Sequence, residues 1–374
     1  MSRTPSDTHP FSPAPSARMG FCGLVLLLVG AAWSCRRSPE RGAPPLATPR
    51  AATQLVVAEQ IAPSGHSEAA LALNVHTEAV LAPSRAASAG AATNASKPQL
   101  RVALEQQTWT FQDPNFGRID VVVVLPDRRA DEKLPMLIAL HGRGEAMKGP
   151  ERGARGWVDD YALLRAMQRL GRPPLTSSDF EGIVSVKRLE KLNQALEREP
   201  YRGLVVLCPY TPDLLAGEKP FEYARPYAQF LVETLLPRAR RELPVIGTPE
   251  TTGIDGVSLG GRVGFLAGLF AAEHFHTVAG LQAAFESSDA VALGRLGDDA
   301  YRRNRGLRFR LLTSDRDYFI EANQSIAAEF ERRHLPLRFL MVPGPHDYIF
   351  NRGPGSIEML FFHDRALRRE AWPE

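Results

Sequence analysis

The segment best suited to catalysis is Ile254 to Gly264, which reads IDGVSLGGRVG. Gly256, Ser258 and Gly260 form the pattern G-x-S-x-G between a predicted strand and a predicted helix. In this pattern the strand turns sharply into the helix and exposes the serine Oγ, while the glycines leave room where a Cβ would collide with neighbouring backbone. A hydroxyl presented in this way can attack an acyl carbon once a base removes its proton. Ser258 is therefore the candidate nucleophile.

A lone G-x-S-x-G is a weak pattern, so the order of its partners along the chain matters. The turn is used with an acid and then a histidine at later positions. His346 directly follows the last predicted strand, where a loop at the carboxyl edge of a sheet can present an imidazole to Ser258. Imidazole titrates near neutrality and can both accept and return the serine proton. His334 and His363 lie at or within helical segments, so His346 is the predicted base.

The acid that would orient His346 is expected after the preceding strand. Thr313 to Tyr318 reads TSDRDY and offers two carboxylates, Asp315 and Asp317. Asp317 is preferred because it lies farther into the loop, and Asp315 stays open as the alternative. The acid would fix the imidazole tautomer and stabilise the imidazolium.

Two backbone N–H groups are needed to stabilise an oxyanion on the acyl group. One is predicted at Leu259, which follows the nucleophile at a helix N-terminus, where unpaired N–H groups and the positive end of the dipole point towards the reacting oxygen. The second is predicted at Arg143, in the glycine-containing loop His141-Gly142-Arg143-Gly144. His141 is interpreted as a structural residue that holds this loop.

From Leu100 onward, apolar runs alternate with amphipathic stretches, which is typical of strands and crossover helices in a mostly parallel sheet. An antiparallel opening pair is predicted at Thr108 to Phe111 and Ile119 to Leu125. The buried strands predicted after it are Met136 to Leu140, Leu204 to Leu207, Thr252 to Val257, Val278 to Leu281, Phe309 to Thr313 and Leu337 to Val342. Gly171 to Pro200 is interpreted as an insertion that covers the mouth of the site.

The motifs LHGRG, GVSLGG and GPHDY together resemble the α/β-hydrolase family, and within it a group of serine esterases. The resemblance covers Leu100 to the C-terminus. It implies an α/β fold with a mostly parallel central sheet flanked by helices, and an acyl-enzyme mechanism in which Ser258 attacks an ester carbonyl and His346 moves the proton. It implies no metal and no organic cofactor. One departure is Pro345 before His346, where a small residue such as glycine is commoner.

Three functions are compatible with these residues. The first is hydrolysis of a carboxylic ester, either a small molecule or an ester linked to a carbohydrate, lipid or other polymer. The second is peptide hydrolysis or acyl transfer on the same residues, because the motifs specify a nucleophile and no leaving group. The third is a surface-displayed binding protein that keeps the scaffold without activity.

Composition argues against a nucleic-acid partner. The 374 residues carry a formal net charge of +3, and 23% of them are charged. Such a balance produces no strong field that would attract a polyanion. The arginines between Arg302 and Arg310 cluster, but they belong to no nucleic-acid-binding motif, so a solvated face is expected.

The three cysteines, Cys22, Cys35 and Cys208, offer no disulfide framework. The apolar stretch Gly20 to Trp33 follows basic residues and precedes small ones, and it is shorter than the roughly 20 residues of a spanning helix, which predicts a signal peptide. Ala32-Trp33-Ser34-Cys35 resembles a bacterial lipoprotein processing site, which implies a lipidated Cys35 and membrane attachment. Ordinary cleavage and secretion stay open as the alternative.

The predicted organisation has three parts. Residues 1–35 form the signal segment, and 36–99 form a disordered tether rich in Ala, Pro, Ser and Thr. Residues 100–374 form one catalytic domain, which is expected outside the cytoplasm in the cell envelope or as a secreted enzyme.

Overall fold

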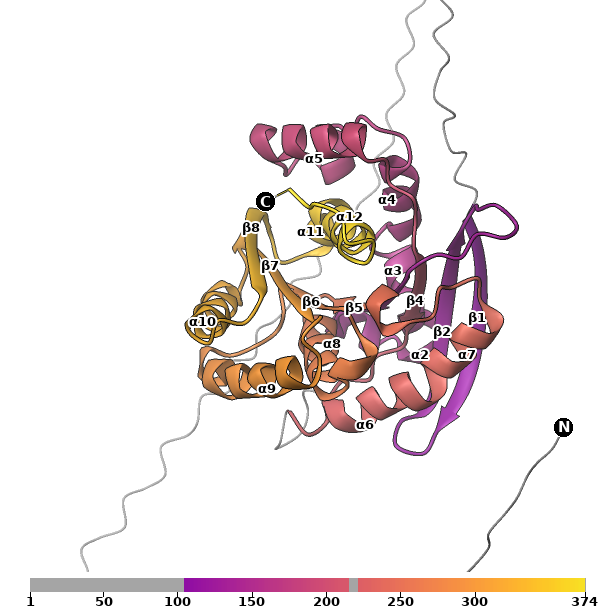
Figure 1. Ribbon diagram of the computed structural model, residues 1–374, viewed down its shortest axis with the longest axis vertical. Helices are drawn as coiled ribbons and strands as arrows, with labels where there is room; N and C mark the ends of the chain where they lie inside the picture. Colours follow the sequence, from indigo (N-terminus) through magenta and orange to yellow (C-terminus); the bar gives the residue numbers. More distant parts are fainter. Residues whose placement is uncertain (1–103, 215–220, 374) are drawn as a thin grey trace, which may run out of the picture. The chain divides into compact units, whose positions relative to one another are not determined.

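The computed structural model describes residues 104–214 and 221–373, which form one eight-stranded sheet in the order β1-β2-β4-β3-β5-β6-β7-β8 (Figure 1). β1 pairs antiparallel with β2, and β2 with β4, whereas the remaining pairs are parallel. The strands are β1 (Leu104–Asp113), β2 (Gly117–Pro126), β3 (Met136–Leu140), β4 (Val205–Pro209), β5 (Thr252–Gly256), β6 (Thr277–Leu281), β7 (Arg308–Arg316) and β8 (Leu337–Pro345). The predicted α/β class with a mostly parallel sheet is confirmed. The predicted signal segment and tether lie outside the described residues.

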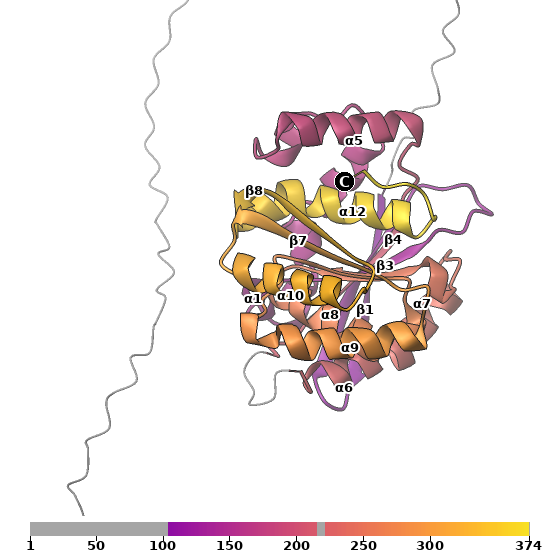
Figure 2. The same cartoon turned by 60° about the vertical axis from the view of Figure 1, so that its left-hand side comes forward.

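Helices cover both faces of the sheet (Figures 1 and 2). One face carries α6 (Ala224–Gln229), α7 (Leu236–Glu242), α8 (Leu259–Phe270), α9 (Ala290–Arg303) and α10 (Ile320–Arg332). The other carries α4 (Leu163–Leu170) and α12 (Ser356–Ala366), with α5 (Val186–Arg198) outside them. The short helices α1 (Arg143–Ala146), α2 (Gly149–Ala154) and α3 (Gly156–Asp159) follow β3, and α11 (Tyr348–Phe350) follows β8.

The central strands β3 and β4 are apolar throughout because both of their faces are buried. In β3, Met136, Ile138 and Leu140 belong to the core beneath α6 to α10, whereas Leu137 and Ala139 belong to the core beneath α4 and α12. All five side chains are 0% exposed. Successive side chains of a strand point to opposite faces, so a sheet covered on both sides selects a continuous apolar run.

The predicted strands are all present, but several of their ends differ from the prediction, and β1 begins at Leu104 instead of Thr108. β7 continues to Arg316 and β8 to Pro345, with an irregular register between Ser314 and Arg316. Apolar patterning marks only the part of a strand that packs in a core, and these extensions are polar or half-buried. The ladder therefore reaches almost to Asp317 and His346 and fixes the starting points of both loops.

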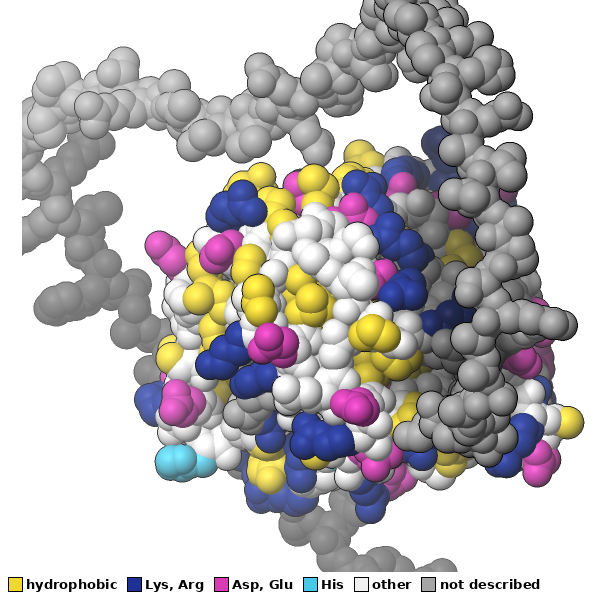
Figure 3. All heavy atoms as spheres, turned by 90° about the horizontal axis from the view of Figure 1, so that it is seen from above, with side chains coloured by type: hydrophobic (Ala, Val, Ile, Leu, Met, Phe, Trp, Pro, Cys, Tyr) yellow, Lys and Arg dark blue, Asp and Glu magenta, His cyan; other side chains and the backbone are white. Residues whose placement is uncertain are grey.

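Charged side chains of both signs lie close together on the surface. On the face drawn in Figure 3, Lys and Arg side chains are next to Asp and Glu side chains, with apolar side chains between them. Several exposed pairs are close in sequence, such as Arg155 with Asp159 and Arg238 with Glu242. Such pairs contribute little to stability individually.

A buried ionic cluster joins α12 to the rest of the fold. The carboxylate of Glu358 accepts hydrogen bonds of 2.7 Å from both Nε and Nη2 of Arg188 on α5, and one of 3.1 Å from Nη2 of Arg310 on β7. Arg310 is 0% and Glu358 1% exposed. A buried guanidinium without its carboxylate would be strongly unfavourable, so this cluster holds α5, α12 and the sheet in one arrangement.

Replacing Glu358 by alanine should lower the free energy of unfolding by about 3 to 5 kcal/mol, because two buried arginines lose their counter-charge. Denaturant titration of the wild type and the variant measures the change. Glu242→Ala is the matched control, since the ion pairs of Glu242 with Arg238 and Arg241 lie on the surface and their loss should change stability little. Equal losses in the two variants would contradict the importance of the buried cluster.

Candidate functional site

Ser258 occupies a strained turn between β5 and α8. Its backbone has φ 56° and ψ −117°, a conformation that is unfavourable for a residue with a Cβ. The turn is fixed by hydrogen bonds on both sides of the residue: the Ser258 N–H donates to the carbonyl of Leu281 (3.0 Å), and its carbonyl accepts from the N–H groups of Arg262 and Ala284 (both 3.0 Å). The observed strand, sharp turn and helix provide the structural context that the G-x-S-x-G pattern requires.

Gly256 and Gly260 are required by close packing at this turn. A Cβ on Gly260 would lie 2.4 Å from the carbonyl oxygens of Leu140 and His141, and a Cβ on Gly256 would lie 2.4 Å from the oxygen of Gly260. Real Cβ atoms do not come so close to backbone, so any side chain here would push α8 away from β3.

His346 and Asp317 form a direct pair. The distance from His346 Nδ1 to Asp317 Oδ1 is 2.7 Å. Asp317 also accepts hydrogen bonds from Thr313 Oγ1 (2.5 Å) and from the N–H of Phe319 (3.0 Å). A carboxylate with such partners accepts hydrogen bonds, so Nδ1 of the neutral imidazole is the donor and Nε2 keeps its lone pair.

The imidazole of His346 is half enclosed by aromatic rings. Tyr318 lies with its ring centroid 5.3 Å from that of His346, and Phe319 packs edge-on at 5.4 Å. The His346 side chain is 15% exposed, whereas the side chain of Asp317 is completely buried. The pair thus has a buried carboxylate and an imidazole that reaches the surface.

The two candidate acids have different surroundings. Asp315 Oδ1 accepts a hydrogen bond from the N–H of Gly344 (2.9 Å), and the Asp315 side chain is 53% exposed. This bond holds the segment before His346. Among the described residues, no hydrogen bond joins Asp315 to the imidazole. Of the two carboxylates, Asp317 is the one that contacts the ring.

A second pair of histidine and carboxylate lies inside the core. His363 Nε2 is 3.0 Å from Asp255 Oδ2, and its Nδ1 is 2.8 Å from Thr277 Oγ1. All three side chains are 0% exposed, and burial lowers the pKa of His363. Because both ring nitrogens are occupied and no surface is accessible, this pair joins α12 to β5 and β6 instead of serving a nucleophile.

The two predicted oxyanion donors are each the first residue of a helix. Leu259 begins α8 and Arg143 begins α1, where backbone N–H groups have no partner within the helix. The N–H of Gly142 is already used, since it donates to the hydroxyl oxygen of Tyr161 at 3.1 Å. A Cβ built on Gly142 would lie 3.8 Å from Ser258 Cβ, so this loop is next to Ser258.

His141 is fixed by bonds to both ring nitrogens. Nε2 accepts the N–H of Thr211 (2.9 Å), and Nδ1 therefore donates to the carbonyl of Gly142 (2.9 Å). Complete burial lowers the pKa of His141 to about 4. The neutral ring ties the loop after β3 to the segment after β4.

A network around Glu145 was not predicted from the sequence. Glu145 is 1% exposed, and its carboxylate accepts hydrogen bonds from the hydroxyls of Tyr161 and Tyr348 (2.7 Å for Tyr348). Burial and the adjacent Glu145 charge raise the pKa of Tyr161, so this hydroxyl stays protonated as a donor. The network connects the loop after β3 with the segment after His346. A glutamate directly after a glycine-rich loop was the only available signal.

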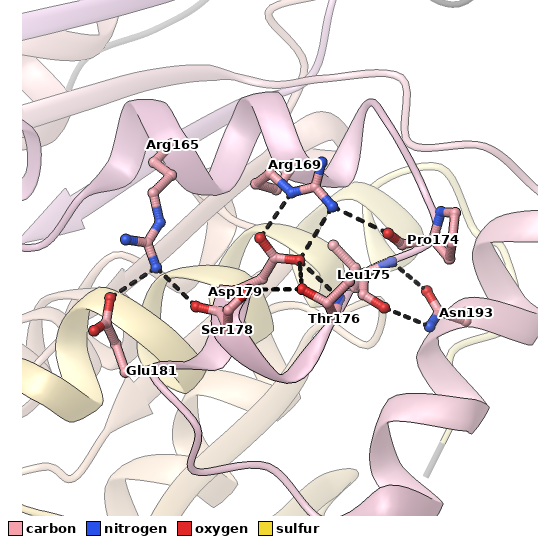
Figure 4. Close-up of polar contacts among 9 residues, drawn as sticks. All are labelled: Arg165, Arg169, Pro174, Leu175, Thr176, Ser178, Asp179, Glu181 and Asn193. Carbon is pink, nitrogen blue, oxygen red and sulfur yellow. Dashed lines mark hydrogen bonds and ion pairs between the residues drawn. The ribbon is translucent and has the colours of Figure 1, made fainter. Parts of the chain in front are cut away.

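The insertion Gly171 to Pro200 is an ordered layer that contacts the loop before His346. Asp179 accepts hydrogen bonds from Arg169 (2.7 Å) and Thr176, and Asn193 on α5 bonds both backbone groups of Leu175 (Figure 4). Ile183 reaches the site region, since its Cδ1 would lie 3.2 Å from a Cβ on Gly344.

Two negative findings apply to residues 104–214 and 221–373. This part of the chain contains no helix long and apolar enough to cross a membrane. It also contains no cluster of three or more His, Cys, Asp or Glu side chains arranged to hold a metal ion. Cys208 is buried in β4, and burial raises the pKa of its thiol.

Solved structures with the same architecture include hydrolases. An S-formylglutathione hydrolase (FrmB) from Staphylococcus aureus shares 15% sequence identity with this chain at a TM-score of 0.50. The match covers 70% of this chain and 99% of the hydrolase. A ferulic acid esterase is 16% identical with a TM-score of 0.51, covering 71% and 99%. This chain has the α/β-hydrolase fold. No family model and no curated protein matches the sequence.

Acidification should destabilise the protein through His141. Its folded pKa of about 4 lies below the unfolded value near 6.5, so the unfolded state binds more protons in this window. The stability contributed by neutral His141 is complete above about pH 6.5 and is lost as pH falls towards 4, by up to about 3 kcal/mol. Denaturant titrations at several pH values measure the slope of the free energy of unfolding against pH. His141→Gln, which keeps a donor and an acceptor, should show a shallower slope, and an equal slope would contradict the assignment.

Proposed function

We propose that this protein is a serine hydrolase that cleaves carboxylic esters, with Ser258 as nucleophile, His346 as base and Asp317 as the acid that orients His346. The observation that carries the proposal is the 2.7 Å contact between His346 Nδ1 and Asp317 Oδ1. It leaves Nε2 as a proton acceptor at the sheet edge where Ser258 occupies its strained turn. A buried acid, a partly exposed imidazole and a partly buried serine on a sharp turn are the groups that nucleophilic serine catalysis needs.

The reaction follows from these positions. Ser258 Oγ attacks the ester carbonyl while its proton passes to Nε2 of His346, and the resulting imidazolium is stabilised by Asp317. The tetrahedral intermediate collapses when the bond to the alcohol breaks, and the alcohol leaves with the proton from His346. Water then gives a proton to His346 and attacks the acyl-enzyme, and the acid product departs as Ser258 recovers its proton.

The negative oxygen of each tetrahedral intermediate would lie between the N–H groups of Leu259 and Arg143. Both residues begin helices, so their N–H groups are unpaired within the helix and carry its positive dipole end. The bond from Gly142 to Tyr161 removes the Gly142 N–H as a donor, and Arg143 is the next residue of the loop after β3. Ester substrates are further supported by the similar solved structures, one of which is a ferulic acid esterase.

Labelling with a fluorophosphonate probe, followed by peptide mapping, tests the nucleophile directly. The wild type should be labelled at Ser258, and Ser258→Ala should lose both labelling and turnover of a panel of esters. A parallel assay on matched amides tests the leaving group. A folded wild type that is not labelled, or that cleaves amides and no ester, would overturn the proposal.

Asp317→Asn should lower kcat by about 10³- to 10⁴-fold, because the amide cannot hold the imidazole in the same tautomer. Asp315→Asn is the matched control on the same loop. Asp315 accepts the N–H of Gly344, forms a surface ion pair with Arg316 (3.7 Å) and is half exposed, so kcat should stay within about tenfold of wild type. Steady-state kinetics compare the two variants. A larger loss in Asp315→Asn than in Asp317→Asn would reverse the assignment.

We also propose that the protein is exported and attached to a membrane through a lipid on Cys35. The support is the apolar stretch Gly20 to Trp33 followed by Cys35. Mass spectrometry of protein expressed in a bacterial host should find a mature chain that begins at an acylated Cys35, and Cys35→Ser should release the enzyme from the membrane fraction. An unmodified mature N-terminus at another residue would refute lipidation.

A further inference from the structure

Gln282 lies at the centre of the candidate site although no part of the mechanism above uses it. It directly follows β6, is 0% exposed and has φ 44°, an unfavourable value for a residue with a side chain. Its N–H donates to the carbonyl of Leu312 on β7 at 2.6 Å. The residue before it, Leu281, accepts the N–H of Ser258 through its carbonyl.

The side-chain amide of Gln282 bonds two segments that carry the other site residues. Nε2 donates to Ser314 Oγ at 2.6 Å and to the carbonyl of Pro345 at 3.0 Å. The carbonyl of Ser314 in turn accepts the N–H of Asp317 at 3.2 Å, and Pro345 is the residue before His346. Gln282 is therefore within one residue or one hydrogen bond of the segments that hold Ser258, Asp317 and His346.

The orientation of this amide is fixed by its partners. The Pro345 carbonyl can only accept, so the NH2 group must face it, and the second N–H meets Ser314 Oγ. The amide oxygen Oε1 is buried without a hydrogen-bond partner in the described part of the chain. An unpaired buried acceptor costs free energy, and it remains here together with an unfavourable φ. The unpaired oxygen and the unfavourable φ thus both occur at the residue that joins the three segments of the proposed site.

We propose that Gln282 is a positioning residue that sets the distance between the His346 imidazole and Ser258. The inference rests on the proposed function of the triad. The amide fixes the carbonyl of Pro345 to the end of β6, and the same strand end accepts the N–H of Ser258. Without the amide, the His346 loop would keep its bond to Asp317 but lose its link to the strand beside the nucleophile. Misplacement of a catalytic group by about 1 Å can cost about 10²-fold in rate.

The test compares Gln282→Met with Asn323→Leu. Methionine has the length of glutamine and no donor, so it removes both hydrogen bonds with little change in volume. Asn323 is an equally buried amide that donates to the carbonyls of Ala283 (3.0 Å) and Phe319 (2.9 Å) and also has an unpaired oxygen. Both variants lose two hydrogen bonds of one side-chain amide, but only the first loosens the residue before His346.

Gln282→Met should lower kcat and the rate of fluorophosphonate labelling by about 10- to 100-fold, with KM changed less than about threefold. Asn323→Leu should show a similar loss in thermal stability with kcat within about threefold of wild type. Equal effects of the two variants on kcat would overturn the inference and assign Gln282 a purely structural role. Inactivity of the wild type would instead reject the proposed function.

If Gln282→Met does not fold, Ser314→Ala decides the question. This variant removes one acceptor of the Gln282 amide and leaves Asp317, Thr313 and His346 unchanged. A several-fold fall in kcat at constant KM supports the positioning role, and an unchanged kcat overturns it.

Discussion

The site depends on how closely the N-terminus of α8 approaches the end of β3. The carbonyls of Leu140 and His141 leave no space for a side chain on Gly260, and Gly260 leaves none on Gly256. This contact forces the chain between them into a turn whose apex is Ser258, with φ 56°. Because the N–H and carbonyl of Ser258 are both bonded, the strain cannot relax and the side chain is held at the sheet edge.

The parallel strands bring the remaining residues of the site to the same edge of the sheet. β3, β5, β6, β7 and β8 run in one direction, so the residues after their carboxyl ends meet at one edge. Each contributes a different part: the loop after β3 offers N–H donors, β5 leads to the serine, β6 to Gln282, β7 to the acid and β8 to the imidazole. Ligand sites at this edge are general for open α/β sheets, since the ends of several elements are brought together there without disturbing the core.

Buried polar groups near this edge form hydrogen bonds that join the loops to one another. His141 links the loops after β3 and β4, and Glu145 links α1 to Tyr161 and Tyr348. A buried polar group is costly unless its partners are in place, so such networks favour one arrangement of the loops over nearby alternatives. The loops that surround Ser258 are therefore held in place where the proposed mechanism needs fixed N–H donors and a fixed imidazole.

The strands and the G-x-S-x-G turn could be predicted from runs of neighbouring residues, because periodicity and local backbone chemistry determine them. The order of the candidate serine, acid and histidine could also be read along the chain. The choice between Asp315 and Asp317 needed the tertiary structure, because it depends on which carboxylate the bulged end of β7 directs at the imidazole. Gln282 gave no sequence signal, and Glu145 gave only its place directly after a glycine-rich loop, since their partners lie as many as 63 and 203 positions away. A sequence can predict motifs made of neighbouring residues. Contacts between residues far apart in the chain could not be predicted, because the folded sheet is what brings those residues together.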